Sequence, residues 1–384
     1  MPRPSLPRFA GPLVLTAVLL NPGATQHGVA GPVPARLAEA AAQPRALTAR
    51  IVFGASVKPR ATDPHSVRSK EINAVLSLES ELGRKLGLDH SYVHFGDAWP
   101  SPEQIWDRSQ GIIPFLNWSA EDPFFSWRQV ADGAADAIID RRAKAAKAFG
   151  WPIFLAFHHE PENDPNYGTP ADYVAAWRHV VERFRLAKAS NVRFVWTLEA
   201  DTFLAHGAGP WYPGSRFIDY VAADGYNWFG AQPGAEWRTA KDIFLPFYRW
   251  ANKHNKPAIV AEFGTLEDPT QPYRKAHWIT SAMTWFKKRP GIRAVMYFDS
   301  DRRHPWWIDT SPQALRAMRL IAHDPAYMPP SPSGGTLLIG RSRASHPATA
   351  WVPRRASSTW SGRWRPPPTR PWPARPPAWW MSRC

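Results

Sequence analysis

The chain has 384 residues, a formal net charge of +15 and a single cysteine, Cys384. Residues 329–384 hold nine arginines and no acidic residue, and residues 1–50 hold five arginines and one glutamate, so the body between them carries only about +2. A nearly neutral body gives no support for nucleic acid or another polyanion as partner, and one cysteine excludes a disulfide framework.

The N-terminal segment has the pattern of a secretory signal. Arg3 and Arg8 give it a basic start, and an apolar stretch follows at residues 11–20. About ten apolar residues are too few for a membrane span, which needs roughly 20. Residues 1–26 are therefore predicted to be a signal peptide, and the Ala/Pro-rich residues 27–49 a linker. We expect a secreted protein that has no stable membrane insertion once the signal is removed.

The body alternates strand-like and helix-like segments. Short apolar runs predict strands at residues 50–56, 91–95, 112–118, 152–157, 192–197, 220–224, 257–262 and 293–298. Amphipathic spacing predicts helices at residues 70–86, 132–149, 170–189, 242–254, 273–288 and 312–322. Eight strands separated mostly by helices predict an α/β fold, a single (β/α)8 TIM barrel over residues 50–328. A doubly wound sheet is the alternative, but no glycine-rich dinucleotide turn follows any strand.

The C-terminal segment, residues 329–384, does not fit a packed element. Prolines and arginines are dense, and its tryptophans follow neither a helix nor a strand period. Such a composition predicts a disordered tail, because it cannot bury enough surface to offset the entropy of ordering. Binding of nucleic acid or of an acidic wall polymer is the less favoured alternative.

Two glutamates stand where predicted strands end. Glu160 follows the fourth strand and Glu262 ends the seventh. Barrel enzymes place their chemistry at the carboxyl ends of the strands, and cleavage of a glycosidic bond needs a pair of carboxyl groups. Each glutamate could instead be an ordinary loop carboxylate. A zinc site of the His-Glu-x-x-His kind would need histidine at 163, where Asn163 stands, so we predict no metal and no cofactor.

Other polar and aromatic residues near strand ends are candidates for substrate contact. Trp118 and Trp307 could stack on sugar rings, although tryptophan is more often core. His94 could hydrogen-bond a sugar hydroxyl. His159 could hold Glu160 in place or contact the sugar itself.

Several motifs together resemble glycoside hydrolase family 26, a family of retaining (β/α)8-barrel glycosidases best known for β-mannanases. The matching stretches are Leu82-Gly83-Arg84-Lys85-Leu86, His159-Glu160, Asn191-Val192-Arg193-Phe194-Val195-Trp196, Asp224-Gly225-Tyr226-Asn227 and Ala261-Glu262-Phe263-Gly264. The resemblance implies that Glu160 is the acid/base, that Glu262 is the nucleophile and that Tyr226 hydrogen-bonds the nucleophile. Mannanases usually carry Arg-Pro before His-Glu, and Met-Asn-Gly with a tryptophan cluster after it. This chain has Ala156-Phe157 and residues 161–165 (PENDP) in those places, which puts mannan itself in question.

The sequence therefore predicts a secreted retaining endo-glycosidase that hydrolyses a β-linked, β-mannan-like polysaccharide by double displacement. We expect a monomer that acts on a polysaccharide or oligosaccharide. The alternatives are the same chemistry on xylan, mixed-linkage glucan or a bacterial exopolysaccharide, or a catalytically silent glycan-binding barrel.

Overall fold

The computed structural model describes residues 50–60, 63 and 69–327. The predicted signal peptide (1–26), linker (27–49) and tail (329–384) lie outside these residues. Within the described part, no helix is both long and apolar enough to cross a bilayer.

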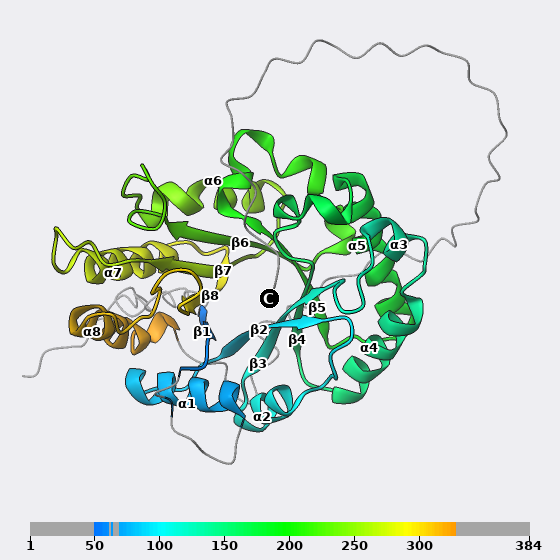
Figure 1. Cartoon of the computed structure of the whole chain (residues 1–384), viewed down its shortest axis with the longest axis horizontal. Helices are drawn as coiled ribbons and strands as arrows, with labels where there is room; N and C mark the ends of the chain where they lie inside the picture. Colours follow the sequence, from blue (N-terminus) through cyan, green and yellow to red (C-terminus); the bar gives the residue numbers. More distant parts are fainter. Residues whose placement is uncertain (1–49, 61–62, 64–68, 328–384) are drawn as a thin grey trace, which may run out of the picture. The chain divides into compact units, whose positions relative to one another are not determined.

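Eight parallel strands close into one barrel (Figure 1), which confirms the predicted (β/α)8 fold. The strands are β1 (Val52–Val57), β2 (Leu88–His94), β3 (Ile113–Ser119), β4 (Ile153–Phe157), β5 (Val192–Glu199), β6 (Tyr220–Asn227), β7 (Ala258–Thr265) and β8 (Ile292–Asp299). Each strand pairs with its neighbour in sequence, and β1 pairs with β8 to close the ring. All carboxyl ends therefore lie at one face of the barrel, where side chains from distant parts of the chain meet.

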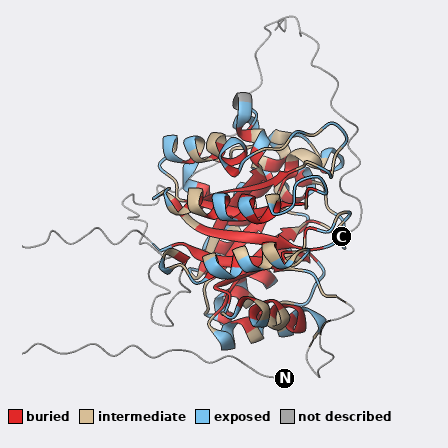
Figure 2. Ribbon diagram, turned by 90° about the vertical axis from the view of Figure 1, so that its left-hand side faces the viewer, coloured by how far each residue is buried: buried red, intermediate tan, exposed pale blue. Residues whose placement is uncertain are grey.

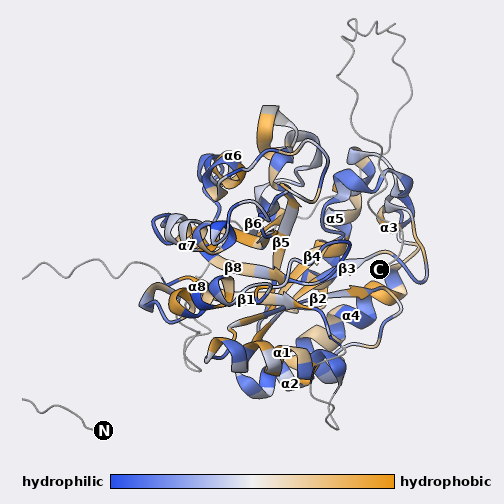
Figure 3. Cartoon of the chain, turned by 60° about the vertical axis from the view of Figure 1, so that its left-hand side comes forward, coloured by the Kyte–Doolittle hydropathy of each residue, from blue (hydrophilic) through white to orange (hydrophobic). Residues whose placement is uncertain are grey.

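Helices surround the barrel. They are α1 (Lys70–Leu82), α2 (Pro102–Gln110), α3 (Trp127–Ala131), α4 (Asp136–Phe149), α5 (Pro170–Leu186), α6 (Ala240–Lys253), α7 (Arg274–Lys287) and α8 (Pro312–Ala322). Short 3-10 turns occupy the loops at η1 (Pro161–Asn163), η2 (Pro165–Tyr167), η3 (Ala200–His206), η4 (Gly209–Trp211), η5 (Ser215–Phe217) and η6 (Pro325–Tyr327). The strands are buried almost throughout and the helices are exposed on their outer faces (Figure 2), with apolar residues turned toward the barrel (Figure 3).

Helices α1 and α2 differ from the sequence prediction for local reasons. The first helix ends at Leu82 rather than at residue 86, because Gly83 takes the left-handed conformation of a helix C-cap, with φ of 69°. Helix α2 was not predicted, since only Gln104 and Asp107 of its side chains are buried and no apolar stripe marks it. Its start is fixed by a capping box at Ser101.

The alternation of side chains along each strand produces two packed layers. One set fills the barrel interior, and the other packs between barrel and helices. On β3, Ile113 and Phe115 point inward, whereas Leu116 and Trp118 belong to the outer layer. Asn117 shares the inward parity and reaches the carboxyl face. Strand parity therefore decides which residues can reach a site at the end of the barrel.

The opposite face is closed by the last described residues. The amide of Ile51 donates to the carbonyl of Ala326 at 2.8 Å. Tyr327 is fully buried and its hydroxyl donates to the carbonyl of Met283. Arg84 donates to the carbonyls of Ala322 and Tyr327. The end of the described chain is thus part of the barrel's packing.

Candidate active site

Glu262 lies within strand β7 and not at its end, because β7 is longer than predicted. An irregularity in β7 directs its side chain into the barrel. Ala223 of β6 pairs with Val260, but the next residue, Asp224, pairs with Glu262, which leaves Ala261 as an extra residue in β7. Val260 points to the helices, and strict alternation would send Glu262 the same way. The bulge resets that parity and re-aims the carboxylate.

Two tyrosine hydroxyls hold the Glu262 carboxylate, one on each oxygen. Tyr92 of β2 donates to Oε1 and Tyr226 of β6 donates to Oε2. Glu262 is 4% exposed, and burial raises its pKa to about 7, while the two tyrosine hydrogen bonds and the charge of Arg302 act to lower it. These donors fix the orientation of the carboxylate and favour its ionised form.

Glu160 follows β4 on a loop with unusual backbone geometry. Both His158 and Glu160 have positive φ, 49° and 48°, a region that non-glycine residues adopt at a cost. The amide of Glu160 donates to the carbonyl of Thr197 on β5 at 3.1 Å, which ties the loop to the next strand. The Nδ2 of Asn163 lies 3.4 Å from Oε2 of Glu160. The backbone and the side chain of Glu160 are thus both held by hydrogen bonds.

A third acidic residue, Asp224, contacts Glu160. Asp224 is 2% exposed, and neither of its carboxylate oxygens receives a hydrogen bond from a donor in the described residues. A hydrogen bond between the carboxyl groups of Asp224 and Glu160 needs a proton on one of them. Burial, then the negative charges of Glu199 and Glu262, raise the pKa of Glu160 well above its usual value. Burial, then the negative charges of Glu262 and Glu160, raise the pKa of Asp224 as well.

One ligand atom each of His159, Glu160 and Asp224 lies within 4.8 Å of the other two, a spacing that would also suit a cation. A proton shared by the two carboxyl groups accounts for the close contact without one, and the absence of a metal stays a prediction. His159 has a pKa well below its usual value, mainly because of burial. It is therefore a neutral imidazole beside the acidic pair.

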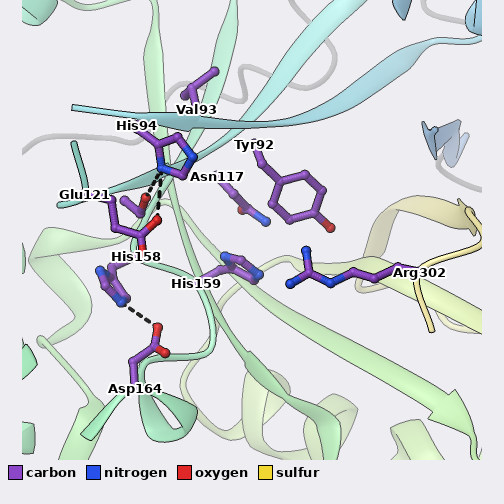
Figure 4. Close-up of a pocket in the computed structure, with 10 residues that line it drawn as sticks. Tyr92, Val93, His94, Asn117, Glu121, His158, His159, Asp164 and Arg302 are labelled. Carbon is purple, nitrogen blue, oxygen red and sulfur yellow. Dashed lines mark hydrogen bonds and ion pairs between the residues drawn. The ribbon is translucent and has the colours of Figure 1, made fainter. Parts of the chain in front are cut away.

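A hollow opens near the carboxyl ends of β2, β3 and β4 (Figure 4). Its lining consists of Tyr92, Val93, His94, Asn117, Ser119, Glu121, His158, His159, Asp164 and Arg302. His94 Nδ1 lies 2.8 Å from Ser119 Oγ and 3.2 Å from Glu121 Oε2. His158 Nε2 lies 2.7 Å from Asp164 Oδ2. Paired polar groups of this kind present fixed donors and acceptors to a ligand rich in hydroxyl groups.

A second hollow lies on the β5–β6 side. It is lined by Glu199, Ala200, Asp201, Asp224, Gly225, Tyr226, Trp228 and Ile243. The ring of Trp228 is 5.0 Å from that of Tyr226 and 5.4 Å from that of Trp306. Asp224 lines this hollow and His159 lines the first one, so the acidic pair lies between the two.

Two tryptophans predicted to contact substrate, Trp118 and Trp307, lie elsewhere than predicted. Trp118 is fully buried between barrel and helices, and its ring packs 4.6 Å from that of Phe95, so the prediction that it contacts sugar is wrong. The inward residue at that level of β3 is Asn117. Trp307 is half-buried, with the guanidinium of Arg60 3.8 Å from its ring centroid. Its neighbour Trp306 is the tryptophan that lies beside Tyr226, at 4.8 Å.

The structure brings together the other predicted site residues and adds three more. Glu160, Glu262, His159, Tyr226 and His94 all lie at the carboxyl face. The residues that the sequence prediction missed are Tyr92, Asp224 and Trp306. Tyr92 has the same strand parity as His94, which was a usable signal. Asp224 stands in a quoted family motif, yet nothing local marks it as a partner of Glu160.

Comparisons with known proteins find similarity in sequence and in fold. The chain is 31% identical over 266 residues to Endoglucanase H of Acetivibrio thermocellus. The aligned stretch covers 64% of this chain and 28% of the relative. The chain thus spans little more than a quarter of the curated relative that it matches. No protein-family model matches the chain.

Solved structures share the fold. A family 26 β-mannanase from Bacteroides ovatus has a TM-score of 0.54 at 14% identity, covering 73% of this chain and 90% of that one. A modular endo-β-1,4-mannanase of the same family from Cellulomonas fimi has a TM-score of 0.57 at 18% identity, covering 78% and 76%. These mannanases share the fold that the resemblance to glycoside hydrolase family 26 implies, and part of the sequence is similar to Endoglucanase H.

Proposed function

We propose that this chain is a retaining glycoside hydrolase that cleaves β-linked polysaccharide. The observation that carries the proposal is the difference in environment between its two glutamates. Glu262 receives a tyrosine hydroxyl on each oxygen, which favours the carboxylate, whereas Glu160 is enclosed among other acidic groups, which favours the carboxylic acid. Two carboxyl groups with different proton affinities are the requirement for acid-assisted displacement.

The reaction then proceeds in two displacements. Glu160 donates its proton to the glycosidic oxygen as that bond to the anomeric carbon breaks, and the Glu262 carboxylate forms an ester bond to the same carbon. Water next attacks the anomeric carbon and displaces Glu262, while the Glu160 carboxylate accepts the proton from that water. The enzyme returns to its starting protonation state.

Endo action and the substrate class are finer parts of the proposal. Hollows on both sides of the acidic pair support a polymer that runs across the site, as endo cleavage needs. The similarity in sequence to an endoglucanase, together with the departures from the mannanase pattern around Glu160, favours a β-glucan over a β-mannan as substrate. We also propose secretion, on the basis of the N-terminal residues, and a monomeric state.

A reducing-sugar assay on soluble mixed-linkage β-glucan, carboxymethyl cellulose, xylan and galactomannan tests the function. Glu262→Ala is expected to abolish turnover on every active substrate. Glu160→Ala should abolish polymer cleavage yet spare aryl glycosides with activated leaving groups, which need little protonation. The exposed Glu182 provides a matched control, Glu182→Ala, with unchanged rates. Polysaccharide binding without release of reducing ends would instead identify a silent glycan-binding barrel.

A further inference from the structure

The loop between β8 and α8, residues 300–311, brings two side chains to the site. Arg302 lines the first hollow beside Tyr92 and His159 (Figure 4), and its charge lowers the pKa of Glu262. Trp306 is 2% exposed and its ring lies 4.8 Å from that of Tyr226, the donor to Glu262. The position of this loop therefore affects the proposed nucleophile by two routes.

Lys275, a buried lysine on α7, contacts the same loop through its ammonium group. Lys275 has no exposed surface, and its Nζ donates to the carbonyl of Trp307 at 2.6 Å and to Thr310 Oγ1 at 2.8 Å. The carbonyl of Trp306 lies 3.5 Å from the same Nζ. Thr310 in turn donates to Glu267 Oε1 at 2.8 Å. An ammonium group has three N–H donors, which equals the number of acceptors around it.

Further contacts fasten the loop at its other side. Arg60, after β1, pairs with Asp309 at 2.7 Å and with Asp299 at 3.3 Å while covering the ring of Trp307. Arg60 is partly exposed, whereas Lys275 is fully buried. Water can therefore compete for the contacts of Arg60 more readily than for those of Lys275.

We propose that Lys275 is a positioning residue for the active site, which acts by holding the β8–α8 loop so that Trp306 and Arg302 keep Tyr226 and Glu262 in place. The inference rests on the proposed function, because its main consequence is a catalytic one. Lys275 itself contacts the loop and has no place in the chemistry.

This role makes the site sensitive to alkaline pH. The charged groups that face Lys275 are Glu267, Asp299 and Asp309, which favour its charge, and Arg60, which opposes it. Burial outweighs the acidic neighbours and lowers the pKa of Lys275 to about 8. Above that pH the neutral amine has two N–H donors for three acceptors, so one loop contact is lost.

The first experiment compares Lys275→Met with Lys256→Met. Lys256 is a matched control, because its Nζ also donates to two loop carbonyls, of Ser215 and Ile218, each at 2.7 Å, but before β6 at the opposite face of the barrel. For folded Lys275→Met we expect kcat/KM on the active polysaccharide to fall by about 10–100-fold, mainly through kcat, since small displacements of reacting groups cost that much. Lys256→Met should stay within about twofold. Equal losses in the two variants, or none in Lys275→Met, would overturn the proposal.

The pH profile separates this role from that of Glu160. On an aryl glycoside with an activated leaving group, protonation by Glu160 is dispensable. The wild type should therefore still lose kcat/KM above about pH 8, and Lys275→Met should be low and flat across that range. Thr310→Val keeps the charge and removes one acceptor, so an intermediate rate is expected even if Lys275→Met fails to fold. A wild-type rate that stays constant through pH 8 on this substrate would contradict the pH link.

A readout independent of activity is trypsin cleavage after Arg302 and Arg303, followed by mass spectrometry of the internal fragments. We expect the loop to resist cleavage in the wild type and in Lys256→Met, and to be cut at least tenfold faster in Lys275→Met. If no glycan is hydrolysed but this pattern holds, the proposed function fails while the anchoring role stands. Equal cleavage rates in all three proteins would refute the anchoring role.

Discussion

Replacing the two tyrosines that hold Glu262 should shift the acidic limb of the pH profile. Tyr226→Phe and Tyr92→Phe each remove one hydroxyl donor from the carboxylate and change little else in volume. A hydrogen bond to a charged group contributes about 1.5–3 kcal/mol, and 1.36 kcal/mol corresponds to one pKa unit. The pKa of Glu262, about 7 in the intact site, should therefore rise by roughly 1–2 units in either variant.

The sign follows from the role of Glu262. The nucleophile must be ionised, and a lost donor destabilises the carboxylate, so a higher pH is needed to ionise it. The acidic limb of kcat/KM on an activated aryl glycoside should move to higher pH by about the same 1–2 units, with rates near pH 7 falling roughly 5–50-fold. Tyr173→Phe is the control: Tyr173 is fully buried, and its hydroxyl donates weakly to the carbonyl of Phe157 at 3.4 Å. An unmoved limb in both variants, or a shift to lower pH, would refute the assignment of Glu262 as the ionised partner.

Three further outcomes follow from the same contacts. Asp224→Ala removes a hydrogen bond that acts to lower the pKa of Glu160, so that pKa should rise and the alkaline limb of polymer cleavage should move to higher pH; an unchanged limb would mean that the two carboxyl groups are not coupled. Phe124 is 55% exposed and its ring lies 4.8 Å from that of Tyr167, whose hydroxyl donates to Glu121 in the lining of the first hollow, so Phe124→Ala should raise KM for long chains and leave aryl glycosides unaffected. Removal of residues 329–384 is predicted to leave Tm unchanged, whereas Tyr327→Ala should cost about 3–5 kcal/mol of stability, visible as a clear drop in Tm by calorimetry.

The fold could be predicted because most elements have a local signal. Most strands are apolar runs and most helices carry an apolar stripe, so the number and order of the strands could be predicted. Strand lengths were underestimated where a strand continues toward the site beyond its apolar run, as in Gly225-Tyr226-Asn227 on β6. Helix α2 went undetected because its contacts with the barrel are mostly polar.

The site was only partly legible because it depends on how strands meet. Glu160 and Glu262 follow apolar runs and are visible as candidates. The inward direction of Glu262, however, requires the bulge at Ala261, which no local pattern announces. Trp118 was misplaced by one residue of parity, and Tyr92 was overlooked although it lies on β2 with the same parity as His94. Contacts between strands that are distant in sequence, such as those of Tyr92 and Tyr226 with Glu262, form only when the barrel closes, so no local sequence pattern predicts them.

The closure of the barrel also has a consequence for synthesis. Strand β1 pairs with β2 only through Gly54 and Ala55, but with β8 along its whole length. Roughly 240 residues separate these two strands in the chain. A ribosome that adds about 5–20 residues per second needs roughly 10–50 s to supply the missing partner. During that time the nascent chain carries an apolar strand with an open edge, so a chaperone or an export factor that binds such edges would have its target at the very start of the domain.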